Sequence, residues 1–97
     1  MSDSRKRQFV LGLAQKAGKL VSGDFAVKNA FKEGRVKILF VARDAAAGSR
    51  KELYFLAEKA GVPVDESLTT DEIGSSIGKG SRISAVLLDE NFLNMLR

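Results

Sequence analysis

The sequence contains no cysteine and no histidine, and these two absences exclude much of the chemistry open to a small protein. Without cysteine there are no disulfides and no thiolate nucleophile, which fits a reducing compartment. Without histidine there is no imidazole base, and the usual ligands of a zinc site are missing. No Ser/Lys pair or carboxylate pair stands at a recognisable catalytic spacing. We therefore expect a protein that is not an enzyme, with no catalytic residue, cofactor, metal site or small-molecule substrate.

Long apolar runs are also missing, and no stretch approaches the length of a membrane span. The first seven residues, Met-Ser-Asp-Ser-Arg-Lys-Arg, lead into an amphipathic segment instead of the apolar region of a signal peptide. We expect a cytoplasmic protein without a membrane partner. The 97 residues, 44% of them hydrophobic, suffice for a single domain over residues 1–97 with a modest core.

The charge of the chain is moderately positive. Lysine and arginine number 16 against 12 acidic residues, so the formal net charge at pH 7 is +4. In a small domain this balance favours a polyanionic partner, most simply nucleic acid.

Apolar periodicity and turn residues predict helices alternating with strands. The run at 36–42 is almost wholly apolar, which indicates a strand buried on both faces in the middle of a sheet. Pro63 favours an edge position for the brief strand 62–64. Such alternation predicts an α/β fold, a three-layer α/β/α sandwich. The expected strands are 19–21, 36–42, 62–64 and 83–88, and the expected helices are 4–17, 22–34, 49–60, 69–77 and one that follows Asp89.

Four of these helices carry recognisable start signals, and the last of them is expected to be capped by Asp89. Ser22 is the expected N-cap of the second helix, which Gly34 ends. Ser49 with Glu52, and likewise Thr69 with Glu72, fit the capping box. The first helix is expected to bury one face, which consists of Phe9, Val10, Leu13, Ala14 and Ala17.

The second helix has an unusual outer face. Its apolar stripe consists of Ala26, Val27, Ala30 and Phe31, so Phe25, Lys28 and Lys32 point away from the core. The helix N-terminus offers free N–H groups and partial positive charge, both of which suit a phosphate. The alternative is a solvated lysine face with Phe25 packed under a neighbouring loop.

A glycine-rich basic loop precedes the last strand. Residues 74–80 lack the phosphate-loop pattern, because Gly74 and Gly78 are one residue too close and Gly80 replaces the Ser or Thr. This excludes nucleotide hydrolysis and leaves Lys79 and Arg82 on an adaptable backbone, which can lie next to the second helix in a sandwich of this kind. The alternative is that both residues are merely solvated.

The order of the segments resembles a known family. Gly-Lys-Leu-Val-Ser-Gly at 18–23 leads into the helix that Gly34 ends, and Val-Lys-Ile-Leu-Phe-Val-Ala-Arg-Asp-Ala follows at 36–45. Val-Pro-Val at 62–64, Ile-Gly-x-x-Ile-Gly at 73–78 and Ala-Val-Leu-Leu-Asp at 85–89 complete the pattern. From about Arg5 to Leu96 the chain resembles the kink-turn-binding L7Ae/L30e ribosomal protein family, and within it the small bacterial YlxQ-like members. The resemblance implies a mixed four-stranded sheet.

The resemblance also implies RNA binding through two elements, which correspond here to 22–32 and 78–82. The family motif Gly-x-Asn-Glu-x-x-Lys, whose Asn and Glu read guanine pairs, has Phe25, Ala26 and Asn29 at its Asn, Glu and Lys positions in this chain. We therefore expect binding by charge and by stacking on Phe25. The expected RNA-binding residues are Lys19, Ser22, Gly23, Asp24, Phe25, Lys28, Asn29, Lys32, Gly78, Lys79, Ser81 and Arg82.

The leading hypothesis is thus a ribosome-associated, non-enzymatic RNA-binding protein whose partner is ribosomal or other structured RNA. The alternative is a protein-interaction module on the same fold. In that case Phe25 is a hydrophobic anchor for a partner surface.

Overall fold

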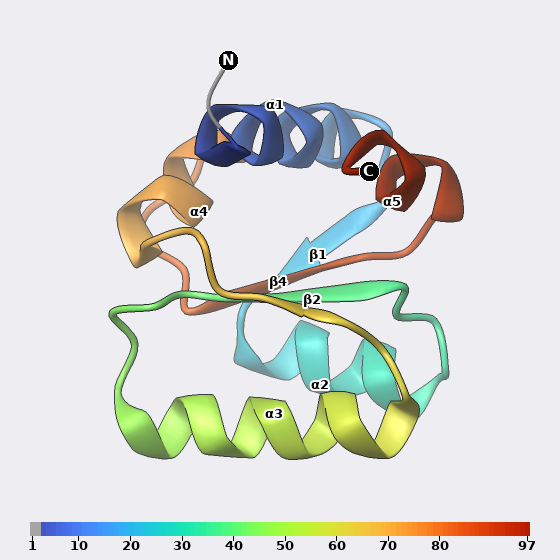
Figure 1. Cartoon of the computed structure of the whole chain (residues 1–97), viewed down its shortest axis with the longest axis vertical. Coiled ribbons are helices and arrows are strands. Elements are labelled where there is room, and N and C mark those ends of the chain that lie inside the picture. The colour runs from blue at the N-terminus through green and yellow to red at the C-terminus, as the bar shows by residue number, and fades with distance from the viewer. Residues whose placement is uncertain (1–2) are drawn as a thin grey trace.

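The computed structural model describes residues 3–97, which form one sheet of four strands with helices on both faces (Figure 1). None of the helices in this range is long and apolar enough to cross a membrane. The helices are α1 (Asp3–Lys16), α2 (Asp24–Lys32), α3 (Ala47–Ala60), α4 (Thr70–Ser76) and α5 (Glu90–Met95). The strands are β1 (Leu20–Ser22), β2 (Ile38–Val41), β3 (Val64–Asp65) and β4 (Ser84–Leu87).

The sheet is mixed, with strand order β1-β4-β2-β3. Strand β4 is antiparallel to both β1 and β2, and β2 is parallel to β3. Helices α1, α4 and α5 cover one face, and α2 and α3 cover the other (Figure 1). The predicted three-layer α/β/α sandwich with a mixed four-stranded sheet is therefore confirmed.

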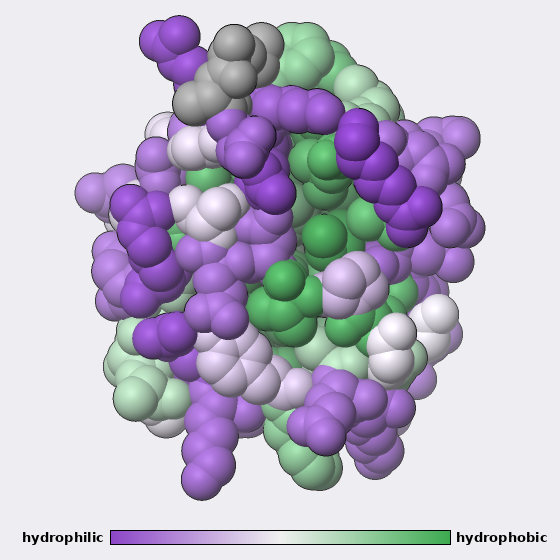
Figure 2. Space-filling view, in the orientation of Figure 1, coloured by the Kyte–Doolittle hydropathy of each residue, from purple (hydrophilic) through white to green (hydrophobic). Residues whose placement is uncertain are grey.

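Alternate residues of the two central strands supply two separate cores. Phe40, Ala85 and Leu87 pack with residues of α1, α4 and α5, whereas Leu39 and Val86 pack with residues of α2 and α3. All residues of β2 and β4 are buried, which confirms that the run at 36–42 provides a strand in the middle of the sheet. On the face shown in Figure 2, apolar side chains gather near the centre and hydrophilic ones surround them.

Two of the predicted caps are wrong. Ser22 is the last residue of β1 and pairs with Ala85, and α2 begins after Gly23, whose φ of 92° and ψ of 153° suit glycine. Helix α3 begins after Ala46, so Ser49 lies inside its first turn. Of the three alanines at 45–47 only Ala47 lies in the helix, and the N-cap Ala46 has no side chain that could accept a hydrogen bond. The capping box of Thr69 and Glu72 and the N-cap Asp89 are confirmed.

The predicted buried face of α1 is partly wrong. The side chain of Phe9 is 57% exposed, whereas Leu11 is fully buried with Val10 and Ala14. The flank of α1 toward α4 is polar, because the Gln8 amide donates a hydrogen bond to Glu72. Ala17, another residue of the predicted face, is exposed as well.

The loop before β4 is fixed to α4 by a close backbone contact. A Cβ added to Gly74 would lie 2.7 Å from the carbonyl carbon of Gly80, so only glycine fits there. The N–H of Lys79 donates to the carbonyl of Gly74 at 2.9 Å, and the N–H of Arg82 donates to that of Thr70 at 3.1 Å. These contacts set the position of residues 78–82.

We expect Gly74→Ala to destabilise the protein by about 1–3 kcal/mol, because the new methyl group displaces the loop backbone. Urea unfolding measures the change. Gly48→Ala is the matched control, because open space surrounds Gly48 near the start of α3. That control should be neutral or stabilising, by up to about 1 kcal/mol. Equal stability of the two variants would show that the loop is not held against α4.

Candidate functional site

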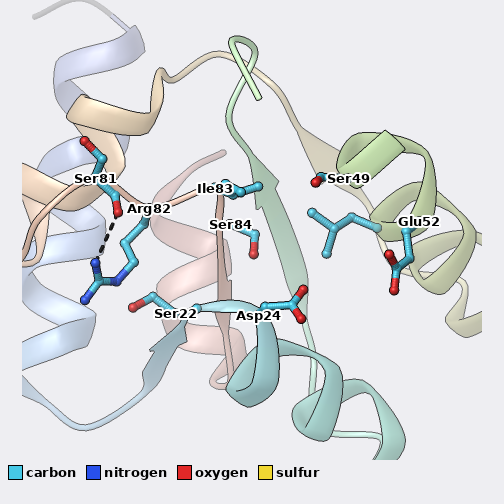
Figure 3. A pocket seen from close by; sticks show the side chains of 10 residues that line it. Ser22, Asp24, Ser49, Glu52, Ser81, Arg82, Ile83 and Ser84 are labelled. Atoms are coloured by element: carbon cyan, nitrogen blue, oxygen red, sulfur yellow. Dashed lines mark hydrogen bonds between the residues drawn. The ribbon is translucent and has the colours of Figure 1, made fainter. Parts of the chain in front are cut away.

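A cleft of about 380 Å³ lies where β1 ends and β4 begins (Figure 3). Three segments form its walls: the start of α2, the first turns of α3 and the end of the loop before β4. The lining residues are Ser22, Gly23, Asp24, Ser49, Glu52, Leu53, Ser81, Arg82, Ile83 and Ser84.

The register of β1 and β4 creates this cleft. Ser22 lies opposite Ala85, and the N–H of Gly23 reaches the carbonyl of Ser84 at 3.5 Å. Because the strands are antiparallel, the residues that follow β1 lie beside the residues that precede β4. The structure therefore brings together the two elements that the sequence singled out, the start of the second helix and residues 78–82.

The α2 wall presents an open helix N-terminus. Its N-cap, Gly23, has no side chain to satisfy the first N–H groups. The N–H of Val27 donates to the carbonyl of Gly23 at 3.0 Å and closes the first turn. The N–H groups of residues 24–26 precede that bond and have no acceptor within the helix. Free N–H groups at a helix start can bind an anion.

The opposite wall is a loop that its own side chains stabilise. The guanidinium Nη1 of Arg82 donates to the carbonyls of Gly80 and Ser81, each at 3.1 Å. The hydroxyl of Ser81 donates to Asp71 at 2.6 Å. Lys79 is exposed, and it makes no ion pair within residues 3–97. The loop thus offers one fixed and one free cation.

Lys28 is not a free cation. Its ammonium pairs with Asp24 at 3.2 Å and with Glu52 of α3. Hydrogen bonds to Glu52 and then to Asp24 raise the pKa of Lys28 above its usual value. The positive charge of Lys28 is thus compensated by two carboxylates. In Figure 3, Arg82 lies on one side of β4, and Asp24 and Glu52 lie on the other.

Phe25 stands outside the cleft on the outer face of α2. Its side chain is 85% exposed, so the alternative that it packs under a neighbouring loop is wrong. Together with Asp24, Lys28, Asn29 and Lys32 it lines a second hollow of about 260 Å³. An exposed ring beside lysines can stack on an unpaired base.

Three expected site residues, Lys19, Gly78 and Lys79, line neither the cleft nor the second hollow. Lys19 precedes Leu20, which pairs with Leu87 at the end of β4 remote from the cleft. Gly78, with φ of 72°, forms the turn after α4 and does not line the cleft. Within residues 3–97, no group of three or more carboxylate side chains is placed to hold a metal ion.

The sequence interpretation missed the α3 wall and the start of β4. Ser49, Glu52 and Leu53 enter the cleft because α3 packs beside α2, a contact without a local signal. Ile83 and Ser84 could have been found, since they directly follow the predicted loop.

These features define an α/β/α domain with a polar cleft between a helix N-terminus and a glycine-rich loop. A model of the ribosomal protein L7Ae/L30e/S12e/Gadd45 family matches residues 5–94, and the chain belongs to this family. The resemblance noted in the sequence is thus confirmed.

Individual relatives agree with this assignment. The chain is 31% identical over 87 residues to RNA-binding protein YlxQ of Bacillus subtilis, covering 90% of this chain and 87% of that protein. A Bacillus halodurans structure of a protein with unknown function superposes with a TM-score of 0.86 at 28% identity, covering 93% of this chain and 91% of that one. The 15.5kD RNA binding protein of Giardia lamblia shares the fold, with a TM-score of 0.82 at 15% identity, covering 99% and 82%.

Proposed function

We propose that this protein binds structured RNA without catalysing a reaction, through the cleft between the start of α2 and residues 78–82. The observation that carries the proposal is the placement of an uncapped helix N-terminus opposite the loop 78–82, whose Arg82 lines the cleft and whose Lys79 is exposed. Membership of the L7Ae/L30e/S12e/Gadd45 family, relatives named RNA-binding protein and a net charge of +4 support it.

Different parts of the surface have different roles in this proposal. The N–H groups of residues 24–26 hold one phosphate, and Lys79 and Arg82 hold others. Lys28 contributes less than these cations, because Asp24 and Glu52 already compensate its charge. The same two carboxylates repel phosphate, and they suit the amino groups of bases, which donate hydrogen bonds to carboxylates.

The specificity of this RNA binding differs from that of the family motif. Phe25 and Ala26 replace the Asn and Glu that read guanine pairs in kink-turn binders. Neither side chain can form hydrogen bonds with a base edge. The exposed ring of Phe25 stacks instead, and stacking tolerates any base. We therefore propose recognition by charge and shape, with weaker dependence on sequence.

Removing the two loop cations should weaken binding and reduce its salt dependence. For Lys79→Ala/Arg82→Ala we expect the slope of log K against log salt concentration to fall by about 0.7–0.9 for each lost phosphate contact. Fluorescence anisotropy with a labelled RNA hairpin that carries an asymmetric internal loop measures both quantities.

The control for this double variant is Lys37→Ala. Lys37 precedes β2, whose first residue pairs with Leu87 at the end of the sheet remote from the cleft. The Lys37→Ala substitution removes one positive charge outside the cleft. The slope of log K against log salt concentration should therefore equal that of the wild type. A double variant with an unchanged slope would refute the proposed face.

Phe25 also favours a second candidate function, a protein contact with this ring as anchor, because a large apolar side chain is 85% exposed. If the ring stacks on RNA, Phe25→Ala should weaken hairpin binding by about 1–3 kcal/mol, and Phe25→Tyr should retain it. A pull-down with and without ribonuclease, analysed by mass spectrometry, separates the functions. A partner that survives digestion and is lost in Phe25→Ala favours the protein contact.

We also propose that the RNA partner is ribosomal, as the family description suggests. The protein should then sediment with ribosomes or their subunits in a sucrose gradient at low salt, and high salt should release it by screening the phosphate contacts. Lys79→Ala/Arg82→Ala should remain near the top of the gradient. Wild-type protein that stays there at low salt would exclude ribosome association.

A further inference from the structure

A groove of about 450 Å³ lies between α2 and α3 and is separate from the cleft. Both helices cover the same face of the sheet (Figure 1). Apolar side chains from both helices line the groove, and lysines from both accompany them. The lining residues are Lys28, Phe31, Lys32, Leu56, Lys59 and Ala60.

Two cations of this groove are free to bind an anion. Lys32 of α2 and Lys59 of α3 are exposed, and neither forms an ion pair in the described part of the chain. No carboxylate lines the groove. Among its lysines, Lys28 pairs with Glu52, which lies outside the groove. A groove with positive charge from both helices attracts a polyanion.

The groove continues the surface around the candidate site. It shares Lys28 and Lys32 with the hollow that contains the exposed ring of Phe25. That hollow shares Asp24 with the cleft. The cleft, the hollow beside Phe25 and the groove thus form one continuous path over the surface.

We propose that the groove between α2 and α3 binds a single-stranded RNA segment that flanks the structured RNA held by the cleft; this rests on the proposed function. Lys32 and Lys59 contact its phosphates, and an unpaired base packs on the apolar side chains of Phe31 and Leu56. A duplex keeps its bases stacked inside and cannot use this apolar surface. An acidic helical peptide is the competing occupant. The shared lysines and the adjacent exposed ring favour RNA.

The test compares three labelled probes: the hairpin with an asymmetric internal loop, and the same hairpin with ten unpaired uridines or ten unpaired adenosines added at its end. The wild-type protein should bind both extended probes about tenfold more tightly than the plain hairpin, because one stacked base has roughly this effect. In Lys59→Glu this gain should disappear, while the affinity for the plain hairpin stays within about twofold of the wild type.

Lys51→Glu is the matched control. Lys51 is exposed on the same helix and lies outside the groove, so the identical charge change should leave the tenfold gain intact. Thermal unfolding of both variants confirms that each is folded. A plain hairpin that does not bind the wild type refutes the proposed function itself.

Two results would refute the proposed role of the groove and leave the proposed function intact. Either the plain hairpin binds and neither extension adds affinity, or the added affinity persists in Lys59→Glu. An acidic amphipathic peptide that binds the wild type but not Lys59→Glu, together with no gain from the extensions, would assign the groove to a protein partner.

Discussion

The antiparallel pairing of β4 with β1 is the interaction on which the candidate site depends. It places the residue after β1 beside the residues before β4, and this alone brings the start of α2 to the loop 78–82. A register shifted by two residues would keep the same side chains buried and would separate the two walls. The contact between Gly74 and Gly80 adds the second constraint, because it fixes the loop that leads into the start of β4.

The charge of the site is less simple than the net positive balance of the chain indicates. Lys28 is held by two carboxylates, and Arg82 donates to carbonyls of its own loop. Lys32 and Lys79 make no ion pair in the described residues, and both lie outside the cleft. In the proposed function the polar cleft orients the RNA, and the surrounding lysines supply much of the affinity.

The regular elements could be predicted because their signals are local. The apolar run at 36–42 could be buried only between two layers, and the spacing of Thr69 and Glu72 completes a capping box within one turn. The helix starts at Ser22 and Ser49 were wrong because a serine is compatible with several local structures. Pairing of β1 with β4 takes Ser22 into the sheet, and α3 begins two residues before Ser49, at Ala47.

The amino-acid sequence was enough to predict the order of helices and strands, the α/β/α class and the family resemblance, and to exclude thiol and imidazole chemistry. Each of these follows from composition, from spacings within one segment or from the order of the segments along the chain. Only the tertiary structure decided that Lys28 is paired with Glu52, that Lys19 lies far from the cleft and that Phe25 is exposed. These properties depend on contacts between side chains of segments that are distant in the sequence. Strand register and helix packing decide which of these contacts form.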